Sequence, residues 1–153
     1  MTPRQAILIK ESYEKFGPNR ELAAKLFYDN LFNIAPETRA LFPDDMTGQY
    51  HKFTAMFRII VGTIDKFDEL EKQLRGLGAR HAKYHARDEH FGAVGEALMM
   101  MLAKRFGTSF TPELKYAWTA AYWRLAMIMQ DAAEKAAPKP APATADPEFY
   151  YVG

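Results

Sequence analysis

The stretch 68–85, DELEKQLRGLGARHAKYH, carries the clearest indication of the fold. Its apolar residues Leu70, Leu74 and Leu77 recur at helical spacing, and no part of it alternates like a half-buried strand. His81 follows Leu77 by four residues, so it falls on the apolar side of the same helix. A buried imidazole is either hydrogen-bonded or bound to a metal ion, and the spacing alone favours a hydrogen-bonded core histidine.

A second interpretation of this stretch is a zinc site. His81 and His85 are one helical turn apart, a spacing at which two imidazoles can share one metal ion, and Asp88, Glu89 or His90 could complete the ligand set. The neighbouring residues are apolar and there is no HExxH motif, so the pattern is a weak indication of zinc.

Helical periodicity continues on both sides of this stretch and predicts an all-α protein. Thr2-Pro3 and Thr111-Pro112 place a capping residue before a proline, the usual order at a helix start. The expected helices cover about 3–16, 20–34, 36–42, 49–64, 65–81, 91–107 and a last one from 112, with a loop at 43–48 and a polar corner at 85–90. On the second helix we expect an apolar side formed by Leu22, Leu26, Phe27, Leu31 and Ile34.

Composition divides the chain into a single helical domain, 1–135, and a tail, 136–153. From Ala136 the sequence AAPKPAPATADP is rich in proline and alanine, which excludes a helix or a core strand. The tail ends with Phe149, Tyr150 and Tyr151, and we interpret it as solvated rather than as an aromatic plug.

The totals exclude several classes of function. The chain has no cysteine, which excludes disulfides, thiolate nucleophiles and iron–sulfur clusters. Its 20 basic and 19 acidic side chains give a formal charge of +1, so we expect neither nucleic-acid nor membrane binding. With no signal peptide at the N-terminus and no apolar segment of about 20 residues, we expect a cytoplasmic protein.

Four segments, taken in order, point to a known family. They are LFYDNLF at 26–32 followed by Pro36 and Leu41-Phe42, LGARHAKYH at 77–85, FGAVGEALM at 91–99 and FTPELKYAWTAAY at 110–122. Together they resemble the globin family, with likeness to neuroglobin and to single-domain bacterial globins related to the haem domain of flavohaemoglobins. The resemblance covers about 4–133 and implies a globin fold with helices packed around a haem pocket.

The resemblance also implies a cofactor and the residues around it. The cofactor is haem b, iron protoporphyrin IX, with His81 as the iron ligand. Counting back from His81 as in these relatives indicates Gln49 as the distal residue, with Tyr28 also facing the bound ligand; a runner-up register places His51 there instead. The implied haem contacts are Phe42, which stacks on the porphyrin, Phe53 on the distal side, Leu77, Phe91 and Val94 on the proximal side, and Lys52 and His85, with Arg80 as a third candidate, at the propionates.

The implied function is reversible binding of dioxygen, and of CO and NO, for oxygen storage, transport or sensing. Hydrogen bonds from Tyr28 and Gln49 would make dioxygen binding tight. The alternative is nitric oxide dioxygenase activity with an external reductase, but Phe91 and Ala133 stand where flavohaemoglobins have a tyrosine and a glutamate, and the reductase domain is missing. We therefore expect an oxygen-binding protein rather than an enzyme, as a monomer or homodimer. A haem-free helical scaffold is a further alternative.

Overall fold

The computed structural model describes residues 1–81 and 88–136, and the side chains at positions 67, 80, 81, 88, 89 and 136 lie outside this description. Every regular element within the described ranges is helical, which confirms the all-α prediction. The α-helices are α1 (Pro3–Glu14), α2 (Arg20–Ile34), α3 (Thr47–Thr63), α4 (Phe67–His81), α5 (Asp88–Phe106) and α6 (Pro112–Ala136). Two short 3₁₀ helices join them, η1 (Pro36–Leu41) and η3 (Gly107–Ser109).

Side-chain caps begin these helices where the sequence offers them. Thr2 accepts a hydrogen bond from the backbone N–H of Gln5, whose side chain accepts one from Thr2 in return, so α1 starts with a complete capping box. Asn19 caps α2 with its side chain, which accepts a hydrogen bond from the backbone N–H of Leu22 at 3.2 Å. These contacts satisfy backbone N–H groups that a helix end would otherwise leave without a partner.

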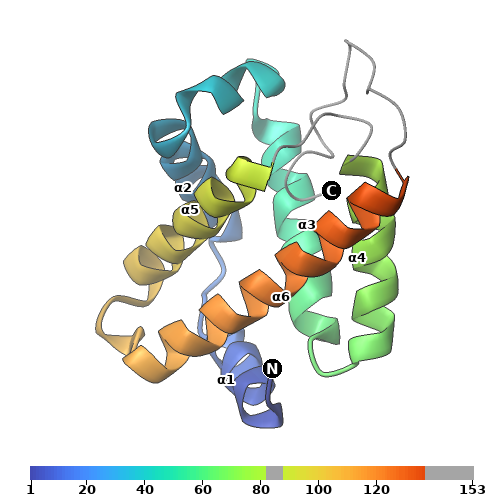
Figure 1. Cartoon of the computed structure of the whole chain (residues 1–153). Helices are drawn as coiled ribbons and strands as arrows, with labels where there is room; N and C mark the ends of the chain where they lie inside the picture. Colours follow the sequence, from blue (N-terminus) through green and yellow to red (C-terminus); the bar gives the residue numbers. More distant parts are fainter. Residues whose placement is uncertain (82–87, 137–153) are drawn as a thin grey trace.

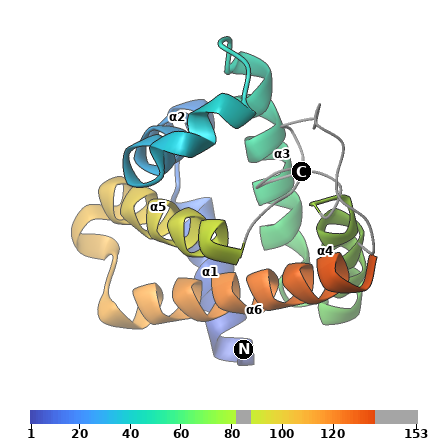
Figure 2. The same ribbon diagram turned by 45° about the horizontal axis from the view of Figure 1, so that its top comes forward.

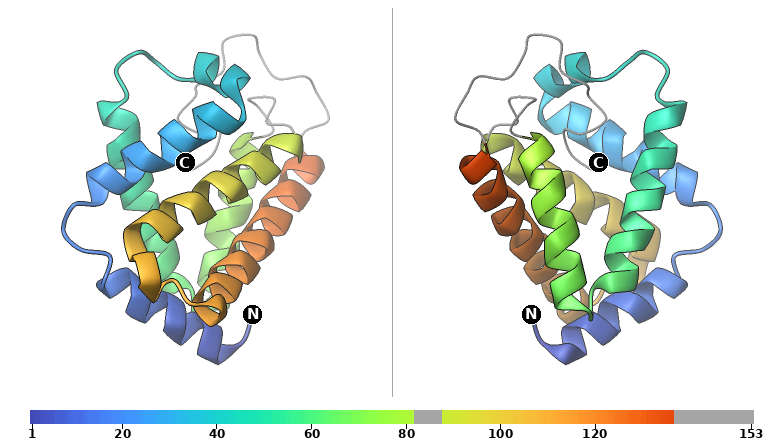
Figure 3. Two further views of the ribbon diagram at one scale, coloured as in Figure 1. Left: turned by 90° about the vertical axis from the view of Figure 1, so that its left-hand side faces the viewer. Right: turned by 90° about the vertical axis from the view of Figure 1, so that its right-hand side faces the viewer.

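The helices pack in pairs around a common interior (Figure 1). Helix α4 lies against α6, and α2 lies against α5 (Figure 2). Helix α3 contacts both α2 and α4, while α1 crosses the end of the bundle and contacts α6 and α3 (Figure 3). The interior is therefore enclosed by α3 on one side and by α4, α5 and α6 on the other.

Two contacts between α1 and α6 join distant parts of the sequence. The indole Nε1 of Trp118 donates to the hydroxyl of Ser12 at 3.1 Å, and this hydroxyl donates to the carbonyl of Ile9 at 2.8 Å. Nearer the surface, Arg4 pairs with Glu113 at 2.7 Å. The buried Trp118–Ser12 hydrogen bond is the more important of the two contacts between α1 and α6, because an exposed ion pair contributes little to stability.

The predictions made from the sequence were wrong for Leu22 and for the starts of α3 and α5. Leu22 is 49% exposed, because it lies two positions before buried Ala24, a rotation of about 200° around α2. Helix α3 begins at Thr47, before the predicted 49, since the Asp45 carboxylate accepts from the Thr47 N–H at 3.0 Å. Helix α5 begins at Asp88, inside the predicted corner.

Candidate functional site

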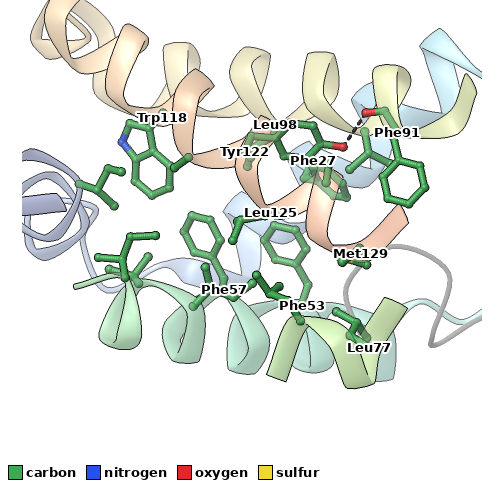
Figure 4. A pocket seen from close by; sticks show the side chains of 18 residues that line it. Phe27, Phe53, Phe57, Leu77, Phe91, Leu98, Trp118, Tyr122, Leu125 and Met129 are labelled. Carbon is green, nitrogen blue, oxygen red and sulfur yellow. Dashed lines mark hydrogen bonds between the residues drawn. The ribbon is translucent and has the colours of Figure 1, made fainter. Parts of the chain in front are cut away.

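A large cavity lies among the α3, α4, α5 and α6 helices. The space within it is ≈ 850 Å³, a value that includes open solvent at its mouth. All six α-helices contribute side chains to its lining. Those labelled in Figure 4 are Phe27, Phe53, Phe57, Leu77, Phe91, Leu98, Trp118, Tyr122, Leu125 and Met129.

The walls of this cavity are apolar, and its tyrosine is already engaged. The hydroxyl of Tyr122 donates to the backbone carbonyl of Phe91, which ties α6 to the first turn of α5 (Figure 4). Burial raises the pKa of Tyr122, so the phenol stays neutral. Its ring lies against Gly95, where a β-carbon would be 2.6 Å from the ring atom Cε2. Gly95 therefore leaves the space that Tyr122 fills.

Helix α4 forms the wall that leads to His81. Leu74 and Leu77 line the cavity, and His81 follows Leu77 by one helical turn as the last residue of α4. The side chain of His81 lies outside the described residues, and so do His85 and the side chain of Arg80. The proximal assignments at these positions stay predictions.

Helix α4 is held against α6 at two adjacent points. A β-carbon on Gly78 would be 2.4 Å from the backbone oxygen of Met129, so the two helix backbones are in direct contact there. One turn earlier, the Arg75 guanidinium pairs with the Asp131 carboxylate at 2.8 Å. Neither contact could be predicted from the sequence, because each depends on which helix lies opposite.

The two predicted distal residues are bonded to each other. Gln49 Nε2 donates to the Tyr28 hydroxyl at 2.9 Å, and the two residues are 5% and 0% exposed. The Tyr28 ring packs edge-on against Phe27 and Phe53, with centroids 5.0 and 5.8 Å away. Phe27 and Phe53 line the cavity, whereas Tyr28 and Gln49 lie one layer of side chains behind them.

The structure distinguishes Gln49 from His51 by their burial. Gln49 is turned into the interior of the bundle, while the His51 side chain is 68% exposed and its Nε2 lies 3.9 Å from a Glu21 carboxylate oxygen. Two residues along a helix correspond to a rotation of about 200°, so both cannot face the same interior.

The remaining predicted contacts divide into two groups. Phe53, Leu77, Phe91 and Val94 line the cavity. Phe42 does not line it, although it is buried: its ring packs edge-on against Tyr28 at 5.4 Å.

Arg39 holds the backbone next to Phe42. Its guanidinium donates to the carbonyls of Phe42 and Pro43 at 3.1 and 3.0 Å. Lys52 is exposed.

The zinc interpretation falls mostly outside the described side chains, because those of His81, His85, Asp88 and Glu89 lie outside them, and it stays a prediction. The described side chains contain no group of three or more histidine, cysteine, aspartate or glutamate residues placed to hold a metal ion. His90 is buried, and its Nε2 lies 3.7 Å from a Glu37 carboxylate oxygen, so it connects α5 with η1. In the described part of the chain, no helix is long and apolar enough to cross a bilayer.

Comparison with known proteins identifies the family. The globin family model matches residues 25–129, which include most of α2, all of α3, α4 and α5, and most of α6. The chain belongs to the globin family.

Individual relatives have moderate identity. An anaerobic nitrite reductase of Oryza sativa subsp. indica is 29% identical and aligns over 87% of this chain and 96% of its own length. A flavohemoprotein of Deinococcus radiodurans is 27% identical over 84% of this chain but only 33% of its own length. Neuroglobin of Danio rerio is 26% identical over 75% of this chain and 81% of its own. The resemblances to neuroglobin and to flavohaemoglobins are thus confirmed.

Globins generally bind haem, and the residues present fit that group. A porphyrin is flat and largely apolar, and the cavity offers it aromatic and aliphatic side chains from all six α-helices. The polar pair Tyr28 and Gln49 lies behind the α3 wall, and the chain has a histidine at the end of the α4 wall. Neutral imidazole is a good iron ligand.

Proposed function

We propose that this chain binds haem b and, through it, reversibly binds dioxygen, with carbon monoxide and nitric oxide as further ligands, for oxygen storage, transport or sensing. The domain responsible is 1–135. The observation that carries the proposal is the buried Tyr28–Gln49 pair behind an apolar cavity of ≈ 850 Å³ in a chain of the globin family.

His81 would be the axial ligand. Leu77, Phe91 and Val94 would contact one face of the porphyrin and Phe53 the other, as the family resemblance implies, and all four line the cavity. Phe42, Lys52 and His85 stay as further proposed contacts, at the porphyrin edge and the propionates. Haem iron supplies the site at which a diatomic gas binds.

The chain's own residues would then set how firmly the gas is held. An amide nitrogen carries two hydrogens, and Gln49 uses one of them for Tyr28. The second amide hydrogen of Gln49 and the Tyr28 hydroxyl would be the donors toward the ligand. Hydrogen bonds to charged partners contribute about 1.5–3 kcal/mol each, so we expect slow dissociation of dioxygen. The same space is lined by apolar side chains.

The first test is the visible absorption spectrum of the purified protein, ferric and then reduced, before and after carbon monoxide. We expect a porphyrin band that shifts with carbon monoxide and that is altered or lost in His81→Ala. The matched control is His51→Ala, which removes an exposed imidazole and should leave the spectrum unchanged. No porphyrin band after addition of haemin would refute the proposal. A spectrum altered only in His51→Ala would favour the other distal register.

The second candidate is an enzyme acting on a nitrogen oxide, because similar proteins include a nitrite reductase and a flavohemoprotein. The chain covers 33% of that flavohemoprotein, so a nitric oxide dioxygenase built on it would need electrons from a separate reductase. The test is steady turnover of NADH and nitric oxide with an added reductase. Turnover no faster than with free haem would exclude this function.

A further inference from the structure

The contact between α4 and α6 bears directly on the residue proposed to bind iron. Gly78 is on α4, three residues before His81, and it faces the backbone of α6. A β-carbon there would lie 2.4 Å from the Met129 carbonyl oxygen and 2.8 Å from the Met129 Cα. Both neighbours are backbone atoms, which cannot rotate away as a side chain could. Helices α4 and α6 therefore approach as closely as two backbones can.

We propose that Gly78 is a positioning residue: its contact with Met129 fixes the last turn of α4 and thereby sets where His81 stands relative to the cavity. This proposal rests on the proposed function. A methyl group at position 78 would need the helices to separate by about 1 Å before ordinary van der Waals contact is restored. His81 is one turn further on the same rigid element, so it would move with the helix.

The neighbouring ion pair supports the contact but does not replace it. Arg75 Nη1 lies 2.8 Å from Asp131 Oδ2, and both side chains are 41% exposed. Such half-exposed pairs contribute little to stability, and their long side chains tolerate small shifts. The position of α4 is therefore set by the backbone contact at Gly78, with Leu74 and Leu77 packed on the side of the cavity.

The test separates positioning of His81 from general packing. Gly78→Ala is made in the natural chain and again in a His81→Gly chain supplied with excess imidazole, which can bind iron without being attached to α4. The readouts are the frequency of the iron–imidazole stretching band and the rate of haem transfer to an acceptor protein. In the natural chain we expect a shifted or weakened band and about 10- to 100-fold faster haem loss. In the His81→Gly chain the stretching band should stay unchanged, and haem loss should accelerate much less, because only the packing of Leu77 is then disturbed.

The matched control is Gly62→Ala in α3, where a β-carbon would meet no atom within 4 Å. It should leave both readouts unchanged in both chains. Equal effects of Gly78→Ala in the two chains, including equal failure to fold, would overturn the proposal and make Gly78 a general packing residue. No effect in either chain would also overturn it. If the unmodified chain binds no haem, the proposed function itself is wrong, a result that is distinct from these.

Discussion

The two sides of the cavity are constructed by different means. On the α3 side, geometry depends on side chains: Gln49 is bonded to Tyr28, and the rings of Phe27 and Phe53 separate this pair from the cavity. On the α4 side, geometry depends on the backbone, since Gly78 meets Met129 without an intervening side chain. Side-chain contacts can be altered one at a time, whereas a backbone contact cannot accept even one methyl group. Under the proposed function, substitutions on the α3 side can therefore adjust ligand affinity, whereas the α4 side fixes how the helices are placed.

The largest effect that would sharpen this comparison is expected from Tyr28→Phe and Gln49→Leu. Each removes a donor worth about 1.5–3 kcal/mol toward a charged partner, which corresponds to about 10- to 150-fold faster dissociation of dioxygen. Stopped-flow measurement of dissociation from the reduced protein tests this. His51→Ala on the same helix serves as the control. Unchanged dissociation in both variants would show that the pair only fills space.

A smaller effect, on stability rather than on affinity, is expected from Tyr122→Phe. The change deletes the hydroxyl that donates to the Phe91 carbonyl while keeping the ring against Gly95. Loss of one such hydrogen bond costs about 0.5–1.5 kcal/mol, so the free energy of unfolding in urea should fall by that amount. Tyr116→Phe, on the same helix but 69% exposed, should change it little. Equal losses in the two variants would contradict a special role for the buried bond.

The smallest effect concerns acid stability of the α4–α6 contact. The Arg75 guanidinium, and after it the Lys135 ammonium, hold the pKa of Asp131 below its usual value of 3.8 in the folded protein. Because the folded pKa is the lower one, this stabilisation is present above about pH 4 and is lost as the pH falls through the folded value. Asp131→Asn should therefore flatten the decline in melting temperature below pH 4. Glu134→Gln, an exposed change on α6, should leave the decline as steep as before.

Much of the fold was predictable because it follows from local patterns. The spacing of Leu70, Leu74 and Leu77 predicts α4, and all three side chains are buried as expected. Gln49 was placed from the family resemblance, and its burial agrees with that register.

The features that could not be predicted from the sequence are contacts between residues of separate helices. The motif Gly76-Leu77-Gly78 indicates only two glycines within a helix. It does not indicate that Gly78 faces the Met129 backbone. Phe42 stays a predicted porphyrin contact, but nothing in the sequence indicated that its ring packs edge-on against Tyr28 or that Arg39 donates to its carbonyl. These outcomes are set by how separate helices meet, which periodicity along one helix does not contain.

The hydrogen bond from Trp118 to Ser12 has a consequence for biosynthesis. The two residues are 106 positions apart, so at about 5–20 residues per second Ser12 is synthesised about 5–20 s before its partner. During that interval the buried face of α1, with Ile9 and Tyr13, has no α6 to pack against. Until Trp118 is synthesised, α1 can therefore pack only on elements such as α3, and its contact with α6 must form afterwards.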